Sequence, residues 1–159
     1  MTATYEAIET QTLASSAASI TFSSIASTYT DLRLVINNQP YGVDLTFNGD
    51  TSGSYSRTTL EGNGTTPDSR RDSNAARIAC YRNNPSASGS TFWNTNIDIF
   101  NYANTSTYKT VLASYTTSSY VYRIVGLWRS TSAITSITVG SYSNFNAGTN
   151  ATLYGIKAE

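Results

Sequence analysis

The sequence predicts an all-β protein, a single-domain antiparallel β-sandwich of jelly-roll type. Short half-apolar runs rich in Val, Ile, Thr and Tyr recur along the chain, and Ser/Gly/Asn clusters separate them at the spacing of about eight to twelve residues that is typical of sandwiches. No run has the length and period of an ordinary helix. The 159 residues suffice for one domain with its own core, residues 1–159. Together these observations predict about nine or ten strands.

The first third of the chain is expected to form four of them. Residues 5–13 alternate weakly, with polar side chains on both faces, which is typical of an edge strand or of a contact arm that lies on a partner. Residues 19–22 predict a short strand. Residues 31–37 and 43–48 alternate cleanly, with inward side chains Leu32, Leu34 and Ile36, and Val43, Leu45 and Phe47. Asn48-Gly49 then predicts a turn, because both residues accept a positive φ.

The middle of the chain is less regular. Residues 51–74 hold only Tyr55 and Leu60 as large apolar side chains, so long loops around one short strand are expected. Residues 75–81 regain apolar character. Residues 92–102 predict a central strand, with Ile97 and Ile99 on one face, and residues 108–115 are expected to run back beside it.

The last third holds the most strand-like segments. Residues 120–128 are a dense run of β-branched and aromatic side chains, and residues 132–139 and 151–157 supply two further strands. A strand so near the end of the chain is expected to pair within a sheet, since a tied-down terminus needs hydrogen-bonding partners. Nothing in these segments indicates catalysis.

Charge limits the possible partners. Ten basic and ten acidic residues cancel, and charged residues make up only 13% of the chain, whereas Ser and Thr reach about thirty per cent. No global field exists to attract nucleic acid or an anionic membrane surface, so neither is expected as a partner. Low net charge favours association, which predicts a homo-oligomer or a place in a larger assembly.

The single cysteine and the N-terminal residues indicate the cellular compartment in which the protein is expected to fold. Cys80 cannot form an internal disulfide, and the sequence has no histidine to activate it as a nucleophile, so a small buried residue is expected. The first residues lack the charged and apolar regions of an export signal, and no run is long enough to span a membrane. Assembly in a reducing cytoplasm is therefore expected.

Acidic side chains are candidate catalysts and candidate metal ligands. A glycosidase would need two of them across a cleft, but the candidates Asp44, Asp50, Glu61, Asp72 and Asp98 are scattered. Asp44, Asn48 and Asp50 offer oxygen atoms that suit calcium, although turn chemistry explains Asn48 and Asp50 without an ion. No enzymatic activity, metal or cofactor is expected.

Arginines form the main concentration of charge. Arg70, Arg71, Arg77 and Arg82 lie close together in the sequence, interleaved with Asp68 and Asp72. Their guanidinium groups could form a docking patch for carboxylates on a partner subunit. The alternative, a loop that needs charge to stay soluble, is left open.

Aromatic side chains provide a second candidate surface, because Tyr and Trp are enriched at interfaces and a flat ring suits a sugar face. Trp128 and Tyr122 are expected in the core. Those in or beside predicted loops are Tyr55, Tyr81, Trp93, Tyr102, Tyr142 and Phe145. For this second group, binding and core packing remain alternatives.

Several segments resemble small virion proteins of tailed bacteriophages. They include Phe47-Asn-Gly-Asp50, Leu127-Trp-Arg129 and Leu153-Tyr-Gly-Ile-Lys157. The full set is residues 4–8, 15–25, 28–32, 47–56, 101–110, 127–138 and 153–157. The resemblance spans residues 4–157 and weakens between residues 61 and 92, where the arginines lie. It implies a β-sandwich or jelly roll without enzymatic activity that assembles on the virion as a trimer or another symmetric oligomer.

Two functional hypotheses follow from this resemblance. The first is a capsid decoration (cement) protein that binds the major capsid protein or other virion subunits through residues 1–13, including Tyr5, and through Arg70, Arg71, Arg77 and Arg82. The second is a tail-fibre or spike module that binds host-surface glycans through loop aromatics such as Trp93. A tip domain usually hangs from a trimeric shaft, and no shaft is expected before Tyr5. This favours the first hypothesis.

Overall fold

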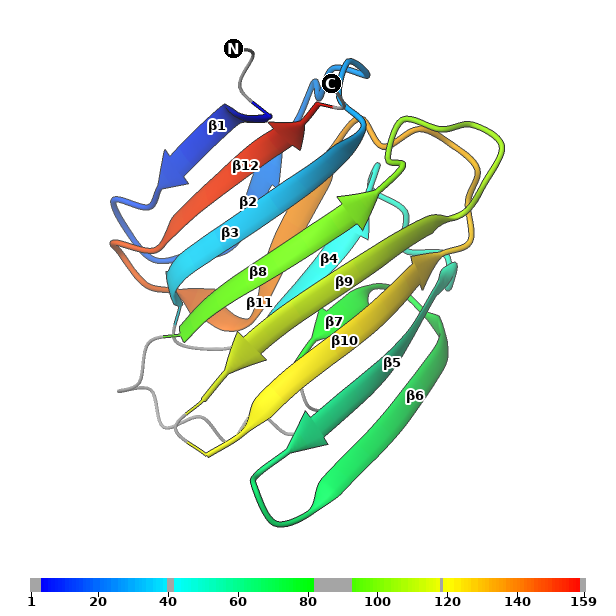
Figure 1. Ribbon diagram of the computed structural model, residues 1–159. Helices are drawn as coiled ribbons and strands as arrows, with labels where there is room; N and C mark the ends of the chain where they lie inside the picture. Colours follow the sequence, from blue (N-terminus) through cyan, green and yellow to red (C-terminus); the bar gives the residue numbers. More distant parts are fainter. Residues whose placement is uncertain (1–3, 40–41, 82–92, 118, 158–159) are drawn as a thin grey trace.

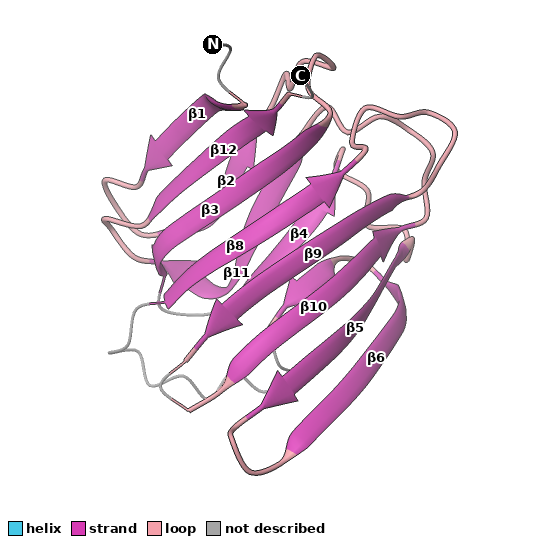
Figure 2. Ribbon diagram, viewed as in Figure 1, coloured by secondary structure: helices cyan, strands magenta, loops and turns pink. Residues whose placement is uncertain are grey.

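A computed structural model describes residues 4–39, 42–81, 93–117 and 119–157, which form strands and connecting loops without a helix (Figure 2). The fold class is confirmed as an all-β sandwich of two antiparallel sheets, but it has twelve strands rather than nine or ten. The strands are β1 (Tyr5–Thr12), β2 (Ala17–Phe22), β3 (Asp31–Gln39), β4 (Val43–Phe47), β5 (Tyr55–Gly62), β6 (Pro67–Ala75), β7 (Ile78–Cys80), β8 (Trp93–Phe100), β9 (Lys109–Thr116), β10 (Val121–Trp128), β11 (Ile137–Phe145) and β12 (Asn150–Ile156).

The two layers differ in width. The large sheet has eight strands in the order β1-β12-β3-β8-β9-β10-β5-β6, and the small sheet has four in the order β2-β11-β4-β7. In Figure 1 the large sheet lies in front of the small one, with the hairpin β5–β6 at one edge and β1 at the other. The first strand, β1, pairs with the last, β12. The segment at residues 5–13 is therefore an edge strand, one of its two predicted forms.

The core lies between the sheets and follows the predicted alternation. Leu32, Leu34 and Ile36 of β3 are fully buried. They face the small sheet, where the inward side chains of β4 are also fully buried (Val43, Leu45 and Phe47). The alternation of apolar and polar residues therefore predicted the buried face of both strands correctly, because one face of each strand packs on the core.

The prediction for residues 51–74 was wrong. These residues form the eight- and nine-residue strands β5 and β6, an antiparallel hairpin that extends the large sheet beyond β10. The inward side chains of β5 after Tyr55 are Arg57, Thr59 and Glu61, and all three are buried. Since the buried face is polar, the hydrophobic alternation that would mark a strand is missing from this segment.

The predicted strand at residues 132–139 starts later than expected, at Ile137. The Asn48 side chain accounts for the delay. Its Oδ1 accepts hydrogen bonds from the backbone amides of Thr135 (2.9 Å) and Ser136 (3.1 Å). Those amides are consequently held by the β4 turn and not by a neighbouring strand.

A glycine allows close contact between the layers at β7. Gly126 lies on the inward side of β10, and a Cβ atom at this position would lie 2.7 Å from Cγ2 of the buried Ile78. The missing side chain therefore makes room for β7 against the large sheet.

An aromatic cluster joins β4, β5 and β10. Trp128 is buried, stacks on Tyr55 with ring centroids 6.3 Å apart, and lies 5.5 Å from the ring of Phe47. Its indole Nε1 donates a 2.7 Å hydrogen bond to Oδ2 of Asp50, in the turn after β4. The cluster thus fixes the turn that follows Asn48-Gly49 to the core.

Candidate interaction surface

The outward face of β9, β10, β5 and β6 combines apolar side chains with hydroxyl groups. Cross-strand pairing places Leu112, Val125 and Thr58 side by side, and it places Leu60 opposite Arg123. Val121, Leu60 and Val125 are 63%, 56% and 47% exposed. We call this surface the outer apolar face and define it by Leu60, Leu112, Val121, Val125 and Leu127, the arginines Arg71 and Arg123, and the Ser and Thr residues between them.

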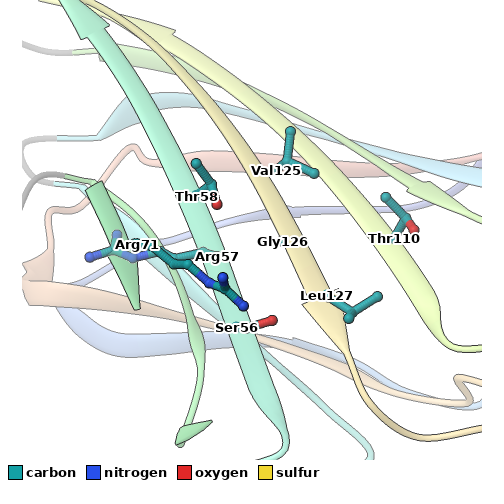
Figure 3. Close-up of a pocket in the computed structure, with 8 residues that line it drawn as sticks. All are labelled: Ser56, Arg57, Thr58, Arg71, Thr110, Val125, Gly126 and Leu127. Carbon is teal, nitrogen blue, oxygen red and sulfur yellow. The ribbon is translucent and has the colours of Figure 1, made fainter. Parts of the chain in front are cut away.

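A shallow, open cavity of about 280 Å³ lies within the outer apolar face. Figure 3 shows Thr58 and Ser56 on β5, Val125 and Leu127 on β10, and Thr110 on β9 around it. Arg71, Arg57 and Gly126 complete its lining. The cavity therefore offers apolar contact, hydroxyl groups and one exposed guanidinium group in a small area.

The charge on this face is entirely positive. Arg71 and Arg123 are exposed, and neither forms an ion pair with any residue that the structure describes. The acidic residues of these four strands lie on the opposite face of the sheet. There Glu61 faces Asp68, and Asp72 faces Arg57. The alternation of β5 and β6 thus places all their carboxylates away from the outer apolar face.

The arginine cluster predicted from the sequence is divided among different surfaces. Arg70 lies on the inward side of β6 and pairs with Asp68 at 3.1 Å, whereas Arg71 lies on the outward side. Arg77 pairs with Asp44 of the small sheet at 3.5 Å. Arg82 is outside the described residues. Of the three described members of this set, Arg71 is the one on the outer apolar face.

Sequence reasoning missed Arg57, the most buried arginine among the described residues. The Arg57 side chain is 6% exposed, and its Nε donates to Oδ2 of Asp72 at 2.6 Å. Its Nη1 donates to the backbone carbonyl oxygens of Ala79 and Tyr81, the latter at 2.5 Å. Arg57 thus ties the β5–β6 hairpin to the segment around β7. The sequence did contain a signal for its burial. Arg57 follows Tyr55 by two residues, so in a strand the two side chains lie on the same, inward face.

Trp93 is a packed side chain. It is 9% exposed and stacks on Tyr115 at 5.8 Å, and Tyr115 in turn stacks on Tyr122 at 4.3 Å. Most of the other loop aromatics considered from the sequence are also buried, namely Tyr55, Tyr81, Tyr102 and Phe145. Tyr142 is the member of that set with an exposed ring. These six aromatic side chains therefore do not form one exposed surface.

Tyr5 lies exposed at the β1 edge of the large sheet. The guanidinium carbon of Arg33 lies 5.6 Å from the centroid of its ring. Arg33 also donates two hydrogen bonds to Asp98, at 2.6 and 3.0 Å, and these bonds raise the pKa of the guanidinium group. Asp98 is therefore held by an arginine on the sheet surface and is not paired with a second acid.

The oxygen atoms considered for calcium are engaged within the protein. Hydrogen bonds from Ser52 and Trp128 hold the pKa of Asp50 well below its usual value, and Asn48 accepts hydrogen bonds from backbone amides. Among the described residues, no group of three His, Cys, Asp or Glu side chains is placed to hold a metal ion. Cys80 is buried as expected, and burial raises the pKa of its thiol to about 12.

Asp44 is a buried carboxylate whose effect on stability can be measured. Asp44 is 7% exposed, and this burial raises its pKa, an effect that Arg77 partly offsets. The folded protein then binds the proton more tightly than the unfolded chain. Its stability should accordingly fall as the pH rises from the unfolded pKa, about 3.9, through the raised folded value.

The variant Asp44→Asn should remove this dependence. We expect the free energy of unfolding of the wild type, relative to that of Asp44→Asn, to be lower at pH 7 than at pH 3. Urea titrations of both proteins at the two pH values measure the difference. A difference that does not change with pH would contradict the assignment.

Comparisons with known proteins leave the family open. No protein-family model matches the chain, and no curated protein matches it. Among solved structures, a mutant of the alginate lyase Aly36B in complex with alginate tetrasaccharide is similar at 8% identity and a TM-score of 0.33, over 82% of this chain and 72% of that one. Aly36B itself gives 9% identity and a TM-score of 0.31, over 94% and 80%. In the described part of the chain, no helix is long and apolar enough to cross a membrane.

Proposed function

We propose that this chain is a non-enzymatic structural protein of a tailed-phage particle, a capsid decoration protein that attaches through the outer apolar face. The observation that carries the proposal is this face, a broad sheet surface with several large apolar side chains exposed on adjacent strands. Contiguous exposed apolar surface is typical of a protein contact site. The low charge of the chain also fits a place in an assembly, because a net charge near zero favours association.

The glycan-binding alternative has weaker support. A sugar-binding surface built on stacking needs exposed flat rings, whereas Trp93 is packed against Tyr115. The carboxylates also do not favour an enzyme, because Asp98 is bound by Arg33 and Asp72 by Arg57. A role through protein contact uses the features that are exposed.

The proposal is tested by finding the protein in the particle and by changing the face. We expect cryo-electron microscopy of particles to show regular density for the protein over the head lattice. Val125→Asp places a charge in the middle of the outer apolar face and should reduce occupancy of particles prepared without the wild-type protein by more than about tenfold.

A control variant separates the face from a general effect of added charge. Tyr142→Asp changes a side chain that is 57% exposed on β11 of the small sheet, and it should leave occupancy unchanged. Circular dichroism must show that both variants are folded. Density only at the tail would instead support receptor binding, and absence from the particle would refute a virion role.

A further inference from the structure

The two arginines of the outer apolar face have apolar neighbours and no acidic partner on that face. Arg71 and Val125 line the same cavity, and Arg123 lies directly opposite Leu60 in the β10–β5 pairing. A protein surface that covers the apolar side chains must also remove water from these guanidinium groups. An arginine that loses its water without a counter-ion is costly, so the covering surface has to supply one.

We propose that the outer apolar face docks a second protein whose apolar surface presents carboxylates to Arg71 and Arg123. The inference rests on the proposed function, since it names the chemistry of the partner at the same face. Arginine forks bind carboxylates through two parallel hydrogen bonds, which fixes the orientation of the partner as well as adding affinity. The apolar side chains supply contact area, and the two guanidinium groups set the register.

Charge argues against the two other occupants. A second copy that docked face to face would bring four arginines together without a free carboxylate, since the acids of β5 and β6 lie on the other side of the sheet and Asp98 of the adjacent β8 is paired with Arg33. A nucleic acid would need a groove of cations that follows its phosphates, whereas this face has two arginines among Val, Leu, Ser and Thr. A different, acidic protein surface fits both features.

A zero-length cross-link can identify the partner residue directly. Arg71→Lys keeps the charge and introduces a primary amine, which a carbodiimide joins as an amide to a carboxylate in contact with it. The background is low because the chain has two lysines, of which Lys109 is buried and Lys157 is paired with Glu6 at 2.6 Å. Arg77→Lys, at an exposed position on the other side of the molecule that is paired with Asp44, is the matched control.

The experiment uses particles assembled with each variant, followed by mass spectrometry of the cross-linked peptides. We expect Arg71→Lys to link to an Asp or Glu of a different particle protein and Arg77→Lys to give no such link. We also expect Arg71→Glu with Arg123→Glu to lower occupancy by more than about tenfold, while Arg77→Gln leaves it unchanged.

The outcomes separate this inference from the proposed function. If the wild type occupies the particle but Arg71→Lys links to another copy of the chain or to nothing, or if the charge reversals bind normally, the acidic-partner inference is wrong and the structural role stands. If the wild type is absent from the particle, both are wrong.

Discussion

Arg57→Ala should lower the free energy of unfolding by about 2–4 kcal/mol, because buried backbone carbonyl oxygens lose the hydrogen bonds that the guanidinium group donates. The guanidinium group is almost fully buried and binds Asp72 and the carbonyl oxygens of Ala79 and Tyr81. Truncation leaves Asp72 without its cation and two carbonyl oxygens without a donor. It also removes the only side chain of β5 with hydrogen bonds to the β7 segment among the contacts that the structure describes. Urea denaturation measures the loss.

Arg70→Ala is the matched control, because Arg70 lies on the neighbouring strand and pairs with Asp68 in a partly exposed position. Such a pair contributes about 0–1 kcal/mol. If the two variants lost the same free energy of unfolding, the burial of Arg57 would not explain its contribution to stability.

Trp128→Ala should also cost about 3–5 kcal/mol, the usual range for truncating a large buried aromatic side chain. The variant removes the ring that packs against Tyr55 and Phe47, and it removes the indole donor to Asp50. Because Asp50 lies in the turn after β4, we expect that turn to loosen as well. Thermal or urea unfolding measures the loss, and amide hydrogen exchange around Asp50 reports on the turn.

Trp128→Phe separates the two contributions. It keeps an aromatic ring in the cluster and removes the donor, so a loss of about 1–2 kcal/mol is expected. If Trp128→Phe were as damaging as Trp128→Ala, the hydrogen bond to Asp50 and not the packing would dominate the stability of the cluster.

The sequence was informative wherever a strand buries apolar side chains on one face. Leu32 to Ile36 and Val43 to Phe47 alternate because the core requires it, and their inward faces were predicted correctly. The β5–β6 hairpin escaped prediction because its buried positions hold Arg57, Thr59 and Glu61, which carry no hydrophobic period. A buried polar side chain needs hydrogen-bonding partners, and those of Arg57 come from other segments, namely Asp72, Ala79 and Tyr81.

The candidate site was harder to predict for a similar reason. Arg70 and Arg71 are neighbours in the sequence and were grouped together, but a strand places adjacent side chains on opposite faces. Once residues 67–75 are assigned as a strand, the group cannot act as one patch. The outer apolar face itself depends on the pairing of β10 with β9 and β5, which local sequence does not specify.

The pairing of β1 with β12 has a consequence for synthesis of the chain. During translation, β1 leaves the ribosome before the other strands but has no neighbour in the sheet until β12, about 140 residues later, has emerged. β12 is also the strand that separates β1 from β3. This edge of the large sheet therefore forms only after β12 has left the ribosome, and such non-local pairing makes folding slow. Until then, the growing chain keeps β1 and one side of β3 unpaired.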